Sequence, residues 1–293
     1  MQRHFTIQKI LIPYDFSETA ALSLEHAVFM AKLMKADIKL LHIIETVSFT
    51  SAISHAFSGF EKKIESSATD QLQELADRIH TESGVNVTIG AEVGRIYRKI
   101  ADSGRQWHAN MIVMGTHGAG GPQQHVAGTN TLRTIAESKC PVISVQTHAK
   151  KLGFTKILLP IDDSEHSREK VPYALEMADA YKAHVHILGL MPGGNEEKKM
   201  KFRIKVEQVD DWLSKHEIMC DTDYVESNDP AKATLDYAEK MDVDLIVIMT
   251  EQNFSLTGTS LGKYANQIIN HSRIPVMSVQ PAEIDPDKMT VSL

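Results

Sequence analysis

The stretch 111–131 has residue types and a spacing that could bind a phosphate. An apolar run at 111–114 is typical of a buried parallel strand, and a helix-like segment follows at 132–138. Between them lie five glycines, at Gly115, Gly118, Gly120, Gly121 and Gly128. Glycine lets backbone N–H groups approach an anion without a Cβ in the way, and the N-terminal end of a helix attracts negative charge. A flexible loop with Thr129 or Asn130 as an ordinary helix N-cap would have a similar composition.

Two common nucleotide-binding motifs do not match this loop. The loop lacks the Lys-Ser/Thr ending of a Walker A motif. It also follows the fourth predicted strand, whereas a dinucleotide-binding fingerprint follows the first strand of its βαβ unit. The sequence therefore predicts a phosphate-binding loop of another type.

Composition and charge exclude several classes of protein. The 293 residues, 42% of them hydrophobic, are enough for two domains with a core each. No apolar run approaches the roughly 20 residues that span a bilayer, and the first residues lack the apolar centre of a signal peptide. The two cysteines fall in different halves and fit a reducing compartment. We therefore expect a cytoplasmic protein that is not bound to membranes.

The net charge of -7 argues against a general nucleic-acid binder, which needs a basic face. The acidic excess lies in the second half, because the first 150 residues hold 15 of the 31 Lys and Arg but only 14 of the 38 Asp and Glu. The near-neutral first half is the easier place to bind a polyanion.

An internal repeat indicates two tandem domains. The strand-like KILIPY at 9–14 is closed by Asp15, and its echo KILLPI at 156–161 is closed by Asp162. A period this long means duplicated domains and not a solenoid. We predict one domain at 1–147 and a second at 154–282, joined by a short linker.

Strands and helices alternate along each copy. Strands are predicted at 9–14, 38–44, 85–93, 111–114 and 142–146, and again at 156–161, 185–191, 219–225, 245–249 and 276–280. Helices are predicted at 17–35, 61–82, 164–182 and 196–215, with further helices after the third and fourth strands of each copy. In the first copy, a connection rich in Ser, Ala and Phe at 46–60 precedes the second helix.

This alternation predicts parallel sheets that helices cover on both faces, with right-handed crossovers. We expect each half to be a small doubly wound α/β domain, with five strands in the order 3-2-1-4-5. Ligands bind such sheets beyond the carboxyl ends of the strands, where the strand order reverses. Asp15 and Gly115 end the two strands that flank this point, so both are expected at one pocket.

Four segments resemble the universal stress protein family, and the resemblance covers nearly the whole chain as two copies. The spacing Gly115-x2-Gly118-x9-Gly128-Thr129 is similar to the nucleotide-binding motif of that family. PYDFSETA resembles the end of its first strand, LLHII its second strand, and ESKCPVISV its last strand. The resemblance implies a Rossmann-like, adenine nucleotide alpha hydrolase-like fold in each half.

The resemblance also implies an adenine nucleotide, ATP with Mg²⁺, as the ligand of the first domain. Adenine and ribose would contact Pro13, Tyr14, Asp15 and Ile43. Ribose and phosphates would contact Met114, Gly115, Gly118, Gly128, Thr129 and Asn130, with His117 as a further candidate inside the loop. From the residues alone, Asp15 could instead cap the following helix, and Ile43 is a core residue in either case.

The second copy departs from the nucleotide-binding motif. Met249, Gln252 and Lys263 stand where the first copy has Gly115, Gly118 and Thr129, and only Gly262 is kept, opposite Gly128. Side chains at these positions would enter the space that a phosphate needs. We therefore expect this degenerate second domain not to bind ATP in the family manner.

Taken together, these features favour a stress-response binding or signalling module over an enzyme. We assign no catalytic residue and no metal ligand, and expect at most slow ATP hydrolysis. His216 and Cys220 are four residues apart, but the predicted helix ends between them. A nucleotide hydrolase or transferase of the wider superfamily would need a Ser-Gly-Gly loop after the first strand or a His-x-Gly-His signature at a helix start. Here the first strand ends in PYDFSE. A scaffold that binds another small ligand, or no nucleotide, remains the alternative.

The last strands of the two copies would be exposed sheet edges, which proteins usually cover or pair. The resemblance implies that the strands at 142–146 and 276–280 pair antiparallel, so that one chain forms its own pseudo-dimer. A further homodimer of chains is compatible with this arrangement, and the sequence identifies no protein partner.

Overall fold

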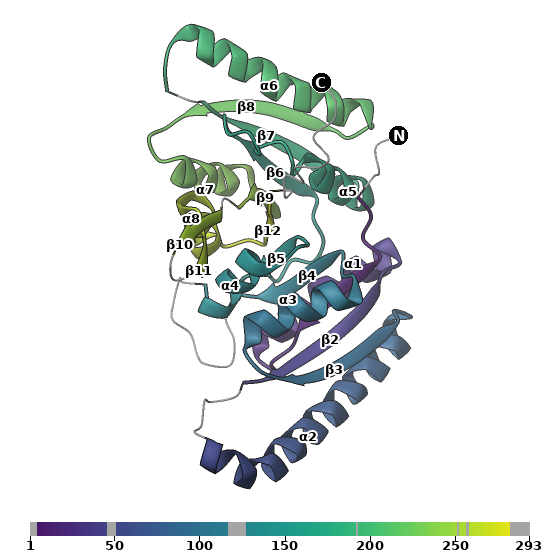
Figure 1. Ribbon diagram of the computed structural model, residues 1–293. Helices are drawn as coiled ribbons and strands as arrows, with labels where there is room; N and C mark the ends of the chain where they lie inside the picture. Colours follow the sequence, from purple (N-terminus) through teal and green to yellow (C-terminus); the bar gives the residue numbers. More distant parts are fainter. Residues whose placement is uncertain are drawn as a thin grey trace, which may run out of the picture.

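The structure, a computed structural model, describes residues 5–45, 51–116, 127–191, 193–250, 252–255 and 258–281. Side chains at 51–64 and throughout 252–260 lie outside the described set. Figure 1 shows the two halves of the chain side by side along one continuous sheet.

Ten of the described strands form a single sheet in the order β3-β2-β1-β4-β5-β12-β9-β6-β7-β8. In the first half the strands are β1 (Lys9–Pro13), β2 (Asp37–Ile44), β3 (Val87–Val93), β4 (Met111–Gly115) and β5 (Val142–Val145). In the second half they are β6 (Lys156–Ile161), β7 (His184–Met191), β8 (Cys220–Glu226), β9 (Leu245–Met249) and β12 (Val276–Val279). All pairs within a half are parallel, so the predicted order 3-2-1-4-5 is confirmed twice.

Helices cover both faces of this sheet (Figure 1). The first half has α1 (Glu18–Met34), α2 (Ser51–Ser83), α3 (Ile96–Trp107) and α4 (Thr129–Glu137). The second half has α5 (Val171–Tyr181), α6 (Glu196–Lys215), α7 (Pro230–Met241) and α8 (Lys263–His271). None of the helices in the described ranges is long and apolar enough to span a membrane.

Two apolar clusters fill the space between the sheet and its two helical layers. One cluster joins α1, α2, α5 and α6 to one face, with Met30, Leu72 and Phe202 among its buried residues. The other joins α3, α4, α7 and α8 to the opposite face, with Ile100 and Ile268. Each cluster contains residues of both halves, so the halves share their core and do not merely touch.

The two halves meet where β5 pairs antiparallel with β12, as the sequence predicts. Val276 lies opposite Ser144, Met277 opposite Ile143, and Ser278 opposite Val142. The pairing turns two sheet edges into interior strands, which removes two sites of unwanted strand addition.

The linker after β5 is held by Asp244, which directly precedes β9. Its carboxylate accepts hydrogen bonds from Lys151 Nζ, from Thr155 Oγ1 and from the backbone N–H groups of Thr155 and Lys156. Burial alone would raise the pKa of Asp244, but these hydrogen bonds outweigh it and lower the pKa. The linker is therefore anchored to the second half by a charged group with several donors.

Three sequence-based predictions of element bounds are wrong. The second helix was expected at 61–82, but α2 begins at Ser51, so most of the predicted connection at 46–60 is helical. The fifth helix was expected from 164, but α5 begins at Val171. A strand pair, β10 (Gln252–Ser255) and β11 (Gly258–Leu261), follows β9 where only a loop into the last helix was expected.

Gly115 lies against the first turn of α1, which starts earlier than its counterpart α5. A Cβ at Gly115 would lie 2.6 Å from Thr19 Cγ2 and 3.2 Å from the Thr19 carbonyl carbon, so the first turn of α1 packs directly on this glycine. In the second half the same position is Met249, and the chain takes turns up to Lys170 before the helix begins. The larger residue thus accompanies a later helix start.

We expect Val142→Lys to destabilise the fold by about 4 kcal/mol, because it would bury an unpaired charge. Val142 is 1% exposed and lies at the β5–β12 seam. The free energy of unfolding from urea denaturation measures this effect. Met219→Lys is the control, since Met219 is 64% exposed and its replacement should change little. An unchanged unfolding midpoint for Val142→Lys would contradict the pairing of β5 with β12.

Gly115→Ala should cost about 1–3 kcal/mol through overpacking against Thr19. Thr19→Ser removes the closest methyl group, so Gly115→Ala should cost less in that background. A double-mutant cycle of unfolding free energies measures the coupling. Gly193→Ala serves as the control, because nothing lies within 4 Å of a Cβ there. Equal costs of Gly115→Ala in both backgrounds would contradict the contact.

Candidate functional site

A cavity of about 340 Å³ lies at the carboxyl ends of β1 and β4, where the strand order reverses. This volume is within the range of small-molecule sites. Its described lining consists of Pro13, Tyr14, Asp15, Ala20, Leu41, Ile43, Ile96, Ile100, Met114, Gly115, Thr116, Gly128, Thr129, Asn130 and Thr131. Nine of the eleven residues expected at the site therefore line one cavity. The other two, His117 and Gly118, lie outside the described residues.

The wall that β1 contributes is held to β2 by two hydrogen bonds around Tyr14. The backbone N–H of Tyr14 donates to Leu41 O at 2.8 Å, and His42 Nδ1 donates to Tyr14 O at 2.8 Å. Because a carbonyl oxygen only accepts, this contact requires the proton on Nδ1. The positioning role of His42 was missed from the sequence, where only its neighbour Ile43 drew attention.

The turn between β1 and α1 is strained at Phe16. Phe16 has φ 63°, a left-handed conformation that is unfavourable for a bulky residue. Asp15 Oδ1 accepts from Ser17 N at 3.1 Å, and Ser17 Oγ accepts from Ala20 N at 3.1 Å. Ser17 is therefore the N-cap of α1, and Asp15 shapes the turn before it. Strain of this kind, worth about 1–3 kcal/mol, persists where the surroundings enforce it and is common at ligand sites.

The opposite wall is the start of α4. Gly128 is its N-cap, with no side-chain hydrogen bond to the cap, so neither Thr129 nor Asn130 has the N-cap role that the alternative interpretation of the loop gave them. Gly128 N donates to Thr116 O at 2.7 Å, and Thr131 Oγ1 donates to Gly115 O at 3.1 Å. These hydrogen bonds hold the start of α4 close to the end of β4. The first N–H groups of α4 are thereby placed at the cavity, where an anion would be stabilised.

The second half contributes one hydrogen bond to this region. Asn270 Oδ1, at the end of α8, accepts from Ala127 N at 2.7 Å. Ala127 directly precedes the N-cap Gly128. The C-terminal end of the glycine loop is thus fixed by a residue that follows it by more than a hundred positions.

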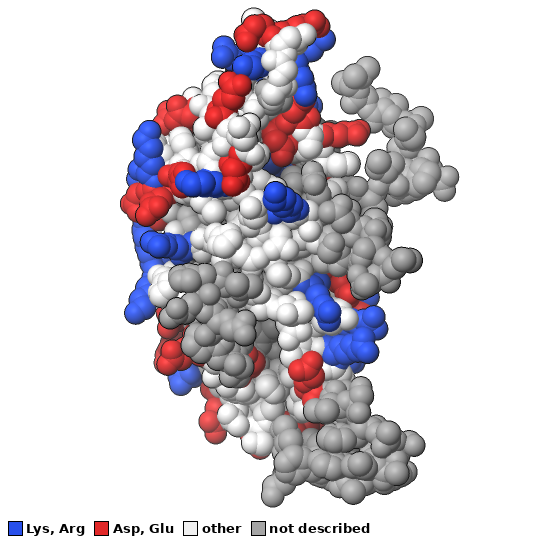
Figure 2. Space-filling view, turned by 90° about the vertical axis from the view of Figure 1, so that its left-hand side faces the viewer, with Lys and Arg blue, Asp and Glu red and all other residues white. Residues whose placement is uncertain are grey.

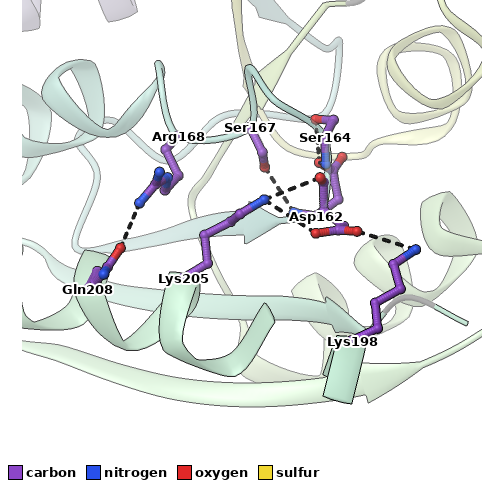
Figure 3. A network of polar contacts seen from close by, with 8 residues as sticks. Asp162, Ser164, Ser167, Arg168, Lys198, Lys205 and Gln208 are labelled. Carbon is purple, nitrogen blue, oxygen red and sulfur yellow. Dashed lines mark hydrogen bonds and ion pairs between the residues drawn. The ribbon is translucent and has the colours of Figure 1, made fainter. Parts of the chain in front are cut away.

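At the corresponding point of the second half, the end of β6 is enclosed by its own polar network (Figure 3). Asp162 Oδ1 accepts from the backbone N–H and the hydroxyl of Ser164, and Ser167 Oγ accepts from Asp162 N. Asp163 is paired at 3.3 Å with both Lys198 and Lys205 of α6. Asp162 thus serves its own turn.

Two further side chains lie near this network, the buried Lys170 and the partly buried Tyr264. The ammonium of Lys170 donates to Ser167 O, and burial lowers the pKa of Lys170 to about 8, against the opposing effect of Asp162. The hydroxyl of Tyr264, which takes the place of Asn130, lies 3.0 Å from Thr234 Oγ1. Burial raises the pKa of Tyr264, so its hydroxyl is neutral.

His216 and Cys220 do not form a metal site with each other. His216 Nδ1 donates to Trp212 O at 2.8 Å, and Cys220 Sγ lies near Ser214 and Asp210. The described residues instead bring His184, His186 and Asp221 together. The sequence signal for this cluster was the His-x-His spacing at the start of a strand, which places both side chains on one face.

Comparisons with known proteins agree with this fold. The model of the universal stress protein family matches residues 6–146 and 153–280. Universal stress protein MJ0577 of Methanocaldococcus jannaschii is 26% identical over 153 residues, which are 47% of this chain and 94% of the relative. Universal stress protein YxiE of Bacillus subtilis is 23% identical over 146 residues, 47% of this chain and 98% of the relative.

Two solved structures match nearly the whole chain. A universal stress protein from Archaeoglobus fulgidus has a TM-score of 0.74 at 20% identity, covering 94% of this chain and 98% of its own. A putative universal stress protein from Pseudomonas aeruginosa has a TM-score of 0.69 at 17% identity, with 94% of each chain covered. With the family model matched over both halves, the chain belongs to the universal stress protein family.

Proposed function

We propose that this tandem universal stress protein binds ATP, with Mg²⁺, in the cavity of its first half and acts as a nucleotide-dependent module in the stress response. The observation that carries the proposal is the cavity itself. It combines apolar lining residues with the start of α4, whose N-cap Gly128 makes no side-chain hydrogen bond. The flat, apolar base of ATP and its negatively charged phosphates need such a pair of surfaces.

The apolar end suits an adenine ring. Aliphatic surface comes from β2, α3 and β4, through Leu41, Ile43, Ile96, Ile100 and Met114. Asp15 also lines the cavity, where its carboxylate would accept a hydrogen bond from the adenine amino group or a ribose hydroxyl. Pro13 and Tyr14 would contact the base through their backbone, since they end β1 at the cavity.

The polar end suits phosphates. Gly115 ends β4, and Gly128, Thr129 and Asn130 open α4, so N–H groups and a hydroxyl converge there. The helix dipole adds to their attraction for negative charge. His117 and Gly118 are proposed phosphate contacts on the motif alone.

Binding, and not fast catalysis, is the role that the lining favours. Tyr14 and Asp15 are the ionisable residues among the described lining residues. Burial raises the pKa of Tyr14, and Asp15 already shapes the turn through Ser17 N. Neither is placed like a general base for phosphoryl transfer, which must reach an attacking water at the γ-phosphate.

We propose further that the second half binds no ATP in this manner. Met249 replaces Gly115, Tyr264 replaces Asn130, and the pair β10–β11 occupies the chain positions of the glycine loop.

The charged groups on the face in Figure 2 are interspersed, without an extended basic patch on its described part. This distribution fits a small-molecule ligand better than a nucleic acid.

The proposal predicts one ATP site per chain by titration calorimetry with Mg²⁺. Asn130→Tyr copies the second half and should abolish binding of both ATP and adenosine, because the ring would fill the cavity. Asn130→Asp keeps the side-chain size but adds a negative charge beside the phosphates. It should weaken ATP binding about tenfold, or by about 1.4 kcal/mol, and leave adenosine binding nearly unchanged.

Asn195→Asp is the matched control, because it adds the same charge at the N-cap of α6 and keeps a good capping residue. It should not alter the titration. Two sites per chain would contradict the assignment of the second half. A wild-type chain that binds neither ATP nor adenosine would overturn the proposed function.

A further inference from the structure

Three potential metal ligands meet between β7 and β8 of the second half. His184 begins β7, and His186 lies on the same face because side chains alternate along a strand. Asp221 of β8 is the register partner of His186. One ligand atom from each of the three residues lies within 4.8 Å of the other two. We propose that these residues bind a divalent transition-metal ion, with Zn²⁺ as the best match.

The polar atoms of this cluster lack ordinary partners in the described chain. His184 Nε2 lies 2.8 Å from Asp221 Oδ2 but makes no hydrogen bond of acceptable geometry. His186 is 5% exposed, and its Nδ1 is buried without a hydrogen-bond partner among the described residues. Buried polar atoms are rarely left unsatisfied, because desolvation is then uncompensated. A simple His184–Asp221 ion pair would not account for His186, whereas a shared metal ion would.

The three ligand atoms need to move only slightly closer together to hold a metal ion. Zinc binds nitrogen and oxygen at about 2.0–2.2 Å, so two tetrahedral ligands lie about 3.4 Å apart. The side chains of His184 and Asp221 are 31% and 67% exposed, so both can move. His186 would be the preformed anchor, packed between the sheet and α7, where its ring lies 6.5 Å from that of Tyr237.

The charges around the cluster favour a cation. Asp221 and Asp223 face it from β8, and Tyr237 donates from α7 to Asp223 Oδ2 at 2.6 Å. Lys156 of β6 is the nearby cation, and its ammonium is engaged with Met241 O at 3.0 Å.

The ligand types select the class of metal. Two imidazoles and one carboxylate suit zinc and its transition-metal neighbours, while Mg²⁺ and Ca²⁺ prefer oxygen ligands. Three protein ligands leave a fourth position for water, because Asp221 is open to solvent. The site is independent of the nucleotide cavity, so it neither requires nor supports the proposed function.

The test is a Zn²⁺ titration of the full chain, free of any polyhistidine tag and of nucleotide, in competition with a chromophoric chelator of known affinity. We expect one Zn²⁺ per chain, with no competition from millimolar Mg²⁺. His184→Ala and Asp221→Asn should each weaken binding by about tenfold or more. Zn²⁺ should raise the thermal midpoint of the wild type and not that of His184→Ala. Circular dichroism of each variant establishes that it folds.

His166→Ala is the matched control. His166 has a similar exposure and a carboxylate partner, Glu169 Oε1 at 2.5 Å, but belongs to no three-ligand cluster in the described chain. It should bind Zn²⁺ as the wild type does, and so should Asn130→Tyr. Equal losses in His166→Ala and His184→Ala would mean adventitious surface binding and overturn the proposal. A wild-type chain without bound Zn²⁺ would overturn it as well.

Discussion

The structure depends on the antiparallel pairing of β5 with β12. Without it each half would end in an open strand edge, and both apolar clusters would be cut where they cross from one half to the other. The pairing also brings α4 close to the end of β12, so that Gln280 Nε2 donates to Ile135 O at 2.6 Å. Because the partner strand is in the same chain, the seam does not depend on protein concentration.

Within this shared frame, the two halves treat the same position of the fold differently. In the first half, Gly115 lets α1 begin at Glu18, and the turn before it accepts strain at Phe16. In the second half, Met249 accompanies a later helix start at Val171, and buried polar groups fill the region at the end of β6. One strand end therefore lines a cavity, and the other carries a polar network of its own among the described residues.

Much of this was predictable from the sequence, and the exceptions have physical causes. Apolar runs closed by Asp15 or Gly115 predicted the strands, and their alternation with helices predicted a doubly wound parallel sheet. With the expected order 3-2-1-4-5, these two residues meet at one cavity. The early start of α2 was missed because its first turns are Ser- and Ala-rich without clear periodicity. The pair β10–β11 was missed because the repeat suggested a loop there. The cluster around His186 depends on the register between β7 and β8, which no local pattern specifies.

The hydrogen bond from Ala127 to Asn270 makes the first cavity a property of both halves. Any ligand that reorders the glycine loop acts on a bond whose acceptor belongs to α8. Linkage is reciprocal. If a change in α8 alters the free energy of ligand binding, ligand binding alters the free energy of that change in α8 by the same amount. The second half is thus linked thermodynamically, through α8, to any change at the cavity of the first half.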